Sequence, residues 1–276
     1  MREVDLIRQE HPGCGVEKMY YTLLPKSLGR DKFCEIFIEL GYRIKNTKNY
    51  KRTTVAGKLY YPNFIEGMSV HRPLQVLQSD ITYYDLGGRF YYIIFIIDVY
   101  TKLILAHQVS DNMRAHENVK MIKKMLDKNQ FVSNQTIHHS DRGSQYSSKE
   151  YTRLLKKSGI KISMGLVATD NAYAERVNGI IKNEYLKRKK IKSFKELKVE
   201  TKKAVSHYNR KRKHRAFKMK FTPLEFRNSL VNLETQKRPK VIIYAEGNSK
   251  FKQTSSLLEF NPKEDPQANN CPIEII

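Results

Sequence analysis

Residues 74–100 have the sequence LQVLQSDITYYDLGGRFYYIIFIIDVY, and this stretch decides the fold. Apolar and polar residues alternate in its first half, a Gly-Gly pair follows, and the second half is an almost unbroken apolar run. This pattern predicts a β-hairpin whose second strand is buried on both faces. If the two glycines form the whole turn, Asp80 pairs with Phe95 and Asp98 with Leu77, so the two acids point to opposite faces of the sheet. A slip of one residue would reverse that conclusion.

The residues after the hairpin alternate between strand and helix patterns. Strands are expected over 102–109, 135–139 and 160–164, and helices over 115–128, 147–159, 170–190 and 193–209. Ser147 and Glu150 have capping-box spacing, Gly159 lies just past the same helix, and Asp170 is a candidate N-cap of the next one. We therefore predict an α/β fold with a mixed five-stranded sheet and flanking helices.

The first part of the chain predicts a small helical domain. Helices are expected over 4–10, 16–24 and 30–42, with Gly41 ending the third. They resemble a helix-turn-helix, and segment 41–58 adds six basic residues and no acid, as expected of an arm along DNA phosphates. A helical bundle followed by a solvated loop explains these residues equally well.

Changes in composition divide the chain into four parts. A helix-turn-helix-like domain over 1–58 and a linker over 59–74 precede the core, which covers 75–235 and ends in basic helices. Residues 236–276 are mostly polar and aperiodic, and we expect a disordered tail there.

The chain is strongly basic. Its 276 residues include 51 Lys and Arg against 28 Asp and Glu, for a formal charge of +23, and residues 182–220 alone hold 17 Lys and Arg against 3 Glu. A hydrophobic content of 40% supports a folded core, so the expected partner is a polyanion, above all nucleic acid. The sequence has no long apolar run, secretion-signal pattern or P-loop, which disfavours membrane, exported and nucleotide-driven proteins.

The cysteines indicate a reducing compartment. Cys14, Cys34 and Cys271 are odd in number and far apart, which disfavours a disulfide framework. His11 and Cys14 could begin a zinc site, but no second close pair completes it. We therefore expect a cytoplasmic protein without structural zinc.

Three acids occupy positions that favour a shared site. Asp80 lies within the first strand of the hairpin, Asp141 follows the strand 135–139, and Glu175 lies early in the helix 170–190. Two carboxylates from strands and one from a helix suit Mg²⁺, and a pair of such ions can clamp a phosphodiester. Glu175 also belongs to a polar stripe at helical spacing, which could contact a phosphate backbone: Asn171, Glu175, Asn178 and Lys182. The alternative is that each aspartate serves a turn and the glutamate is merely solvated.

Nearby polar residues have simpler interpretations. His138 and His139 alternate in facing, so one is expected to point to the core and the other towards Asp141, and structural roles are favoured for both. Asp98 ends an apolar strand, and its simplest expected role is to stabilise the turn that follows.

Three blocks of the sequence resemble a known family. LQSDITYY, HHSDRGSQYSS and DNAYAERVNGIIKNEYL look like the catalytic blocks of the DDE transposases of IS-three-type bacterial insertion sequences, relatives of retroviral integrases. Further blocks, LIRQEHPGCGVEKMYYTL, GRDKF, KNYKRTT and HYNRKRKH with FTPLEF, extend the resemblance over about residues 5–228. The resemblance implies a ribonuclease-H-like core, dependence on Mg²⁺ or Mn²⁺ with two ions, and cutting and joining of the element's DNA ends.

The family's site residues fall on matching positions of this chain. Its catalytic and metal-binding acids fall on Asp80, Asp141 and Glu175, and its basic residue seven positions later falls on Lys182. The interval from Asp141 to Glu175 is shorter than usual, which puts the loop between them in doubt but not the ligands. Leu77 replaces a usual tryptophan and Lys213 a usual proline.

The resulting hypothesis is a transposase that acts on DNA in the bacterial cytoplasm, associated with the nucleoid. Residues expected to bind DNA are Lys182, Lys187, Arg188, Lys189 and Lys190 in the basic block and Arg43, Lys48, Lys51 and Arg52 in the arm. Expected partners are insertion-sequence ends, target DNA, further copies of the chain, and the protein of an upstream reading frame, since the chain starts without the segment that usually precedes this region. The alternatives are a ribonuclease-H-type nuclease and an inactive DNA-binding remnant.

Overall fold

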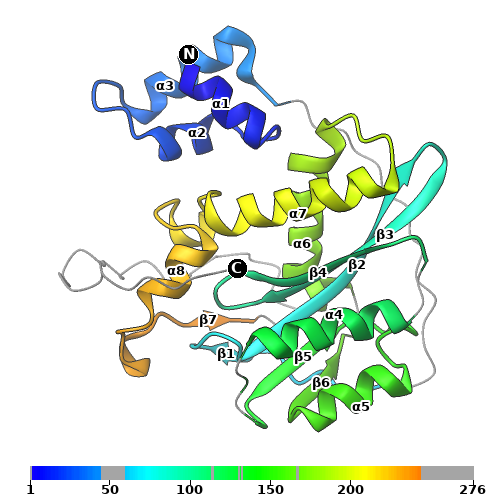
Figure 1. Cartoon of the computed structure of the whole chain (residues 1–276). Coiled ribbons are helices and arrows are strands. Elements are labelled where there is room, and N and C mark those ends of the chain that lie inside the picture. The colour runs from blue at the N-terminus through cyan, green and yellow to red at the C-terminus, as the bar shows by residue number, and fades with distance from the viewer. Residues whose placement is uncertain are drawn as a thin grey trace.

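The computed structural model describes residues 2–44, 60–112, 115–129, 131, 133–165 and 168–243. The N-terminal helices lie above a five-stranded sheet with helices on both faces (Figure 1). Its strands run in the order β4 (Ile104–Ser110), β3 (Arg89–Asp98), β2 (Val76–Leu86), β5 (Thr136–Ser140) and β6 (Ile160–Met164). The β4–β3 and β3–β2 pairs are antiparallel, while β2–β5 and β5–β6 are parallel. This is the mixed, ribonuclease-H-like sheet that the sequence predicts.

The hairpin formed by β2 and β3 has the predicted register. Leu86 pairs with Arg89, so Gly87 and Gly88 alone form the turn, with φ angles of +62° and +84° that favour glycine. Asp80 pairs with Phe95 and Leu77 with Asp98. The two aspartates therefore lie on opposite faces of the sheet, as the two-residue turn requires.

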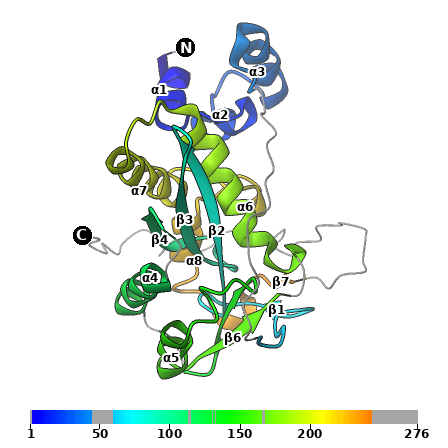
Figure 2. The ribbon, with the colours of Figure 1, turned by 90° about the vertical axis from the view of Figure 1, so that its right-hand side faces the viewer.

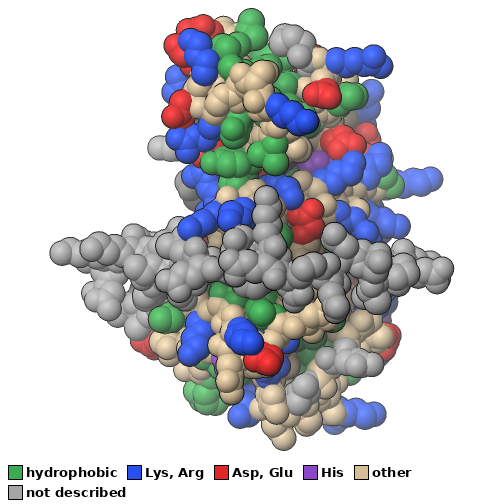
Figure 3. Space-filling model, turned by 90° about the vertical axis from the view of Figure 1, so that its left-hand side faces the viewer, with side chains coloured by type: hydrophobic (Ala, Val, Ile, Leu, Met, Phe, Trp, Pro, Cys, Tyr) green, Lys and Arg blue, Asp and Glu red, His purple; other side chains and the backbone are tan. Residues whose placement is uncertain are grey.

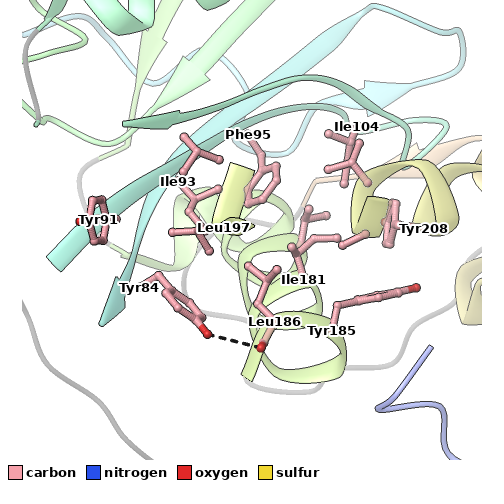
Figure 4. Close-up of a cluster of buried hydrophobic side chains, with 14 of the residues drawn as sticks. Tyr84, Tyr91, Ile93, Phe95, Ile104, Ile181, Tyr185, Leu186, Leu197 and Tyr208 are labelled. Atoms are coloured by element: carbon pink, nitrogen blue, oxygen red, sulfur yellow. Dashed lines mark hydrogen bonds between the residues drawn. The ribbon is translucent and has the colours of Figure 1, made fainter. Parts of the chain in front are cut away.

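The apolar run of β3 is buried on both faces because successive side chains enter different cores. On one face, Ile93, Phe95 and Ile97 pack against the helices after Asn171, as the close-up in Figure 4 shows for several of them. On the other face, Ile94 and Ile96 pack against α4 (Ala115–Lys128) and α5 (Lys149–Lys157). The sheet is thus the middle layer of the core, and its β2 strand is covered on both sides.

The helices of the core follow the predicted segments with shifted caps. Ser148, not Ser147, is the N-cap of α5, and its Oγ accepts from the Tyr151 amide at 3.4 Å. A 3₁₀ turn over Ala168–Asn171 contains Asp170 and precedes α6 (Ala172–Ile180), so Asn171 rather than Asp170 occupies the N-cap position.

The helical run continues beyond α6 through a π-helical turn, Ile181–Tyr185, and a 3₁₀ turn, Leu186–Arg188. Next come α7 (Phe194–Arg210), a 3₁₀ turn (Arg215–Phe217), α8 (Pro223–Ser229) and another 3₁₀ turn (Thr235–Lys237). No helix in the described part of the chain is both long and apolar enough to span a membrane.

Two boundaries differ from the expectation. The expected linker contains β1 (Ser69–Val70), which pairs antiparallel with β7 (Val241–Ile242) from the expected tail. Val70 is fully buried, and Val241 and Ile243 are buried in the same cluster. Residues 236–243 therefore belong to the folded part, because their few apolar side chains complete this cluster, while 244–276 lie outside the described residues.

The N-terminal domain has the three expected helices, α1 (Arg2–Glu10), α2 (Val16–Leu23) and α3 (Arg30–Phe37), the last extended by a π-helical turn over Ile38–Tyr42. Gly41 ends this extension with a φ of +85°. The helices share a small apolar core formed by Val4, Cys14, Val16, Met19, Phe33 and Phe37. Most of the expected basic arm, from residue 45 onward, lies outside the described residues.

Candidate active site

Strand pairing brings Asp80 and Asp141 side by side. In the parallel pair of β2 and β5, Ser79 is the partner of Ser140. Asp80 is the next residue of β2, and Asp141 is the first residue after β5. Neighbouring strands lie about 4.8 Å apart in any sheet. The last residue of β5 is Ser140, so the chain beyond it is free to turn and present the Asp141 carboxylate. Both sequence-predicted aspartates therefore lie next to the Ser79–Ser140 pair.

Asp80 is a partly buried carboxylate surrounded by like charge. Its pKa is raised to about 7, mainly by burial and then by the charge of Asp141, with a smaller effect of Glu175. The Ile81 amide and Asn178 partly oppose this shift, and Asn178 Nδ2 donates to Asp80 Oδ2 at 2.8 Å. One oxygen of Asp80 is thus held by the protein.

Asp141 begins a tight turn that contains Gly143. The Gly143 amide donates to Asp141 Oδ1 at 3.0 Å. A Cβ at position 143 would lie 2.3 Å from Gln145 Nε2 and 3.0 Å from Asp141 Oδ1, so glycine leaves space for the carboxylate. Burial raises the pKa of Asp141, and the Gly143 hydrogen bond lowers it in part.

The helix that carries Glu175 is fastened along β2 (Figure 2). Asn171 Nδ2 donates to the Ser79 carbonyl at 2.8 Å, Asn178 bonds to Asp80, and Lys182 Nζ donates to Thr82 Oγ1 at 3.0 Å. Three members of the predicted polar stripe therefore contact the strand. This contact lowers the freedom of Lys182 to reach phosphate, and its pKa is lowered by burial and by Lys187.

Gln78 is a site residue that the sequence did not reveal. It is fully buried, and its Oε1 accepts from the amides of Tyr173 and Ala174 at 3.1 and 3.2 Å, in the first turn of α6. Its Nε2 donates to the Asp170 carbonyl at 3.1 Å. A β2 side chain thus caps the helix in place of Asn171, which makes no side-chain cap. The only signal in the sequence was an amide two residues before Asp80.

Glu175 faces solvent on the same helix, and its pKa is raised by partial loss of hydration and then by the charge of Asp141. The three acids are close enough for their charges to interact. Within the described ranges, however, no group of three His, Cys, Asp or Glu side chains is assembled as metal ligands.

The donor chemistry nevertheless fits a divalent cation. The site offers carboxylate oxygens, and Asn178 Oδ1 is buried beside Asp80 with no hydrogen-bond partner in the described part of the chain. Burial raises the pKa values of Asp80, Asp141 and Glu175, and repulsion by neighbouring acids adds to the shift for Asp80 and Glu175. A bound cation would relieve this repulsion. Catalytic contacts that are long without substrate commonly tighten when it binds.

The neighbouring polar residues have structural roles. His138 Nε2 is 3.0 Å from the Tyr151 hydroxyl, and His139 Nδ1 is 2.9 Å from Ser163 Oγ. Burial lowers their pKa values to about 3 and about 4, so both rings are neutral at pH 7. Asp98 accepts from Thr101 Oγ1 at 2.6 Å, which is the turn-stabilising role expected of it.

The basic residues named from the sequence lie in different settings. Lys187, Arg188 and Lys190 are exposed at the end of the helical run that begins with α6, whereas Lys189 pairs with Glu200. Arg43 is exposed at the end of the N-terminal domain, and Lys48, Lys51 and Arg52 lie outside the described residues. On one face of the molecule, Lys and Arg side chains form a band below the N-terminal helices (Figure 3).

The chain resembles known proteins over most of its length. A family model described as integrase core domain matches residues 70–169, and a second model with this description matches 158–223. The transposase for insertion sequence element IS629 of Shigella sonnei is 33% identical over 224 residues, which cover 76% of this chain and 73% of that protein. The chain belongs to the IS-three-type transposases with an integrase core.

Two further likenesses extend the comparison. The putative transposase for IS986/IS6110 of Mycobacterium tuberculosis is 33% identical to this transposase over 147 residues, or 51% of this chain and 53% of that protein. The HTLV-2 integrase catalytic core domain, solved in complex with magnesium, has a TM-score of 0.42 and 19% identity. That match covers 52% of the transposase and 90% of the viral domain.

Proposed function

We propose that the transposase cuts a DNA strand at each end of its insertion sequence and joins the freed 3′-hydroxyl to another phosphodiester. Asp80, Asp141 and Glu175 are the catalytic acids and would hold Mg²⁺ or Mn²⁺, as two ions. Divalent ions held there would supply Lewis-acid stabilisation of the attacking and leaving oxygens. The observation that carries the proposal is the pairing of Ser79 with Ser140, which aligns Asp80 with Asp141 beneath the helix that bears Glu175.

The chain's own residues prepare the acids for this role. Asn178 donates to Asp80 Oδ2, and the Gly143 amide donates to Asp141 Oδ1, so each aspartate is held in place by a hydrogen bond. Gln78 and Asn171 fix the start of α6 against β2 and thereby limit where Glu175 can move. Catalysis of phosphoryl transfer consists mainly of such positioning and charge stabilisation.

The charge distribution supports DNA as substrate. The basic block 182–220 begins on the catalytic helical run, so DNA held by Lys182, Lys187, Arg188, Lys189 and Lys190 would pass close to the acids. Residues 1–58 would act as the helix-turn-helix-like domain that recognises the element's ends, with Arg43, Lys48, Lys51 and Arg52 contributing to this contact. The core would span 75–235. Further copies of the chain, and the upstream-frame protein of the element, would join it on DNA at the bacterial nucleoid.

The decisive experiment incubates the purified protein with labelled end DNA, a target plasmid and Mg²⁺. Nicked ends together with joined products are expected, and Asp141→Asn should abolish both. Nicking without joining would favour a ribonuclease-H-type nuclease, and binding without either product would favour an inactive DNA-binding remnant.

A further inference from the structure

Glu184 is a charged junction between the N-terminal domain and the core. It lies nine residues after Glu175 on the same helical run. Its carboxylate contacts His11 Nε2 at 2.7 Å, Lys18 Nζ at 2.6 Å, and Arg212 Nε and Nη2 at 2.9 Å each. His11 and Lys18 belong to the N-terminal domain, and Arg212 follows α7. One side chain therefore joins three parts of the molecule.

The backbone makes the same junction. The Gly13 amide donates to the Glu184 carbonyl at 2.6 Å, and a Cβ at Gly13 would lie 2.3 Å from Glu184 Cα. The His11 ring stacks on Tyr185, with centroids 4.4 Å apart and planes 2° from parallel. The loop between α1 and α2 is thus in direct contact with the helical run, at a distance that only glycine allows.

The junction depends on charge. Burial alone would raise the pKa of Glu184, but hydrogen bonds from His11 and Arg212, together with the charges of Arg212 and Lys18, keep it well below its usual range. Removing one member of such a group leaves buried charges without a partner, which is strongly unfavourable. Glu184 therefore stays ionised, and its cations stay bound to it.

The remaining contacts between the N-terminal domain and the core, along the seam between them, are weaker than those of Glu184. Lys211 pairs with Glu10 and Arg215 with Glu17, and these pairs are largely exposed. Exposed ion pairs stabilise weakly. A pocket of about 260 Å³ opens along the same seam, lined from the two sides by residues that include Thr22 and Arg210. Docking of the N-terminal domain thus rests chiefly on the contacts of Glu184.

We propose that Glu184 is a positioning residue that docks the N-terminal helices in cis against the helical run bearing Glu175. This rests on the proposed function, in which the N-terminal helices hold the element's end. DNA bound by these helices then lies in a fixed position and orientation relative to the acids of the same chain. Loss of the junction leaves the core able to cut DNA but removes its preference for the element's own ends.

The first test compares Gly13→Ala with Gly15→Ala in the whole 276-residue chain. A methyl group at Gly13 would meet three backbone atoms of Glu184 within 2.9 Å, whereas one at Gly15 would meet nothing within 4 Å. Neither glycine has a positive φ, so alanine is otherwise acceptable at both positions. Gly13→Ala therefore separates the domains without altering any catalytic or DNA-binding side chain.

The position of the N-terminal domain relative to the core is measured by a method that does not depend on DNA cleavage. Spin labels are placed at Ser27 and Val199, which are exposed on the N-terminal domain and on α7, in a background where Cys34 and Cys271 are serine. The parent and Gly15→Ala should give one narrow distance distribution, and Gly13→Ala a broad, displaced one. An unchanged distribution in Gly13→Ala overturns the proposal.

Cleavage gives the functional readout. Mn²⁺-dependent cutting of end duplexes should fall about 10- to 100-fold in Gly13→Ala, while cutting of random duplexes stays within about twofold, because misplacement by about 1 Å can lower a rate by about 100-fold. Equal reductions on both duplexes contradict the proposal. If the parent cuts neither duplex, the proposed function fails, while the label distances still decide whether Glu184 docks the domains.

A second pair of variants tests the carboxylate itself. Glu184→Gln should reproduce the effects of Gly13→Ala. Glu200→Gln is the matched control, because Glu200 also accepts from two lysines, Lys189 and Lys203, but both belong to the core. The control should keep the parent distance distribution and end preference. If Glu200→Gln separates the domains to the same extent, the specific role of Glu184 is overturned. If Glu184→Gln fails to fold, the comparison of Gly13→Ala with Gly15→Ala still decides whether this junction docks the domains.

Discussion

Asn178 of α6 donates a 2.8 Å hydrogen bond to Oδ2 of Asp80, across the contact between α6 and the central strand β2. The bond joins the helix bearing Glu175 to the strand bearing Asp80, at a point three residues beyond Glu175 along the helix. It also leaves Asn178 Oδ1 buried without a partner in the described part of the chain. One amide therefore links the position of the helix to the orientation of the Asp80 carboxylate.

Replacing this amide should loosen the site without unfolding the protein. Asn178→Ala frees the Asp80 carboxylate, and removal of such supporting groups typically lowers metal affinity or activity by about 10- to 100-fold. We expect a higher Mg²⁺ requirement in strand cleavage and weaker Mg²⁺ binding by calorimetry. Asn183→Ala is the control, since Asn183 is exposed on the same helical run and should behave as the parent. Equal Mg²⁺ binding in both variants would show that the hydrogen bond is unimportant.

Substituting the aspartates should separate binding from chemistry. Asp80→Asn and Asp141→Asn are nearly isosteric and remove one negative charge each, so repulsion of DNA phosphate falls slightly. Strand cleavage should collapse while DNA affinity holds or rises. Gel-based cleavage and fluorescence-anisotropy binding on one end duplex measure the two effects. Full cleavage activity in either variant would exclude that residue from the site.

The raised pKa of Asp80 predicts a pH-dependent stability in metal-free buffer. The folded-state pKa of about 7 exceeds the unfolded value of about 3.9, so the stability contributed by Asp80 is complete below pH ~4 and is lost as pH rises towards 7. Asp80→Asn removes this dependence. Its Tm should equal that of the parent near pH 4 and exceed it near pH 8, as thermal unfolding will measure. A Tm difference that does not change with pH would contradict the shift.

Much of the core follows from local sequence, whereas its long-range polar contacts do not. The glycine pair fixes the hairpin register, and that register correctly separated Asp80 from Asp98. Gln78 was missed because its partners lie 92 to 96 residues away, and an amide within a strand carries no local signal of capping. The β1–β7 pair was missed because two-residue strands have no periodicity. The N-cap of α5 is Ser148, one residue after the predicted Ser147, because adjacent serines compete for this position.

Gln78 offers a test of whether the start of α6 matters to the site. Gln78→Leu keeps the volume but leaves the Tyr173 and Ala174 amides without their acceptor, at a cost of about 1–3 kcal/mol for each buried group left unpaired. Chemical denaturation should register this destabilisation, and cleavage should fall because Glu175 is displaced. Gln108→Leu is the matched control, since the Gln108 amide donates to Val109 and Glu117, away from α6. A comparable decrease of cleavage in both variants would contradict the capping role.

Removing charges from the basic block 182–220 and from the N-terminal arm 41–58 should have different effects on DNA binding. Lysine contacts to phosphate carry no sequence information, whereas a helix-turn-helix can reach base edges. Neutralising Lys187, Arg188, Lys189 and Lys190 should weaken binding to all DNA. It should also flatten the salt dependence of binding, by a slope of about 0.9 for each phosphate that the protein no longer neutralises. Lys189 should contribute least, because Glu200 already partners it.

Neutralising Lys48, Lys51 and Arg52 should instead reduce the preference for the element's ends more than general affinity. Binding of both variants to end and random duplexes is measured across a salt series, with the parent protein alongside. The block variant should lose affinity for both duplexes equally, since its contacts are to backbone alone. The arm variant should lose affinity mainly for end duplexes. If both variants lose affinity equally for end and random duplexes, this contradicts the prediction that the basic block binds phosphates while the arm recognises the ends.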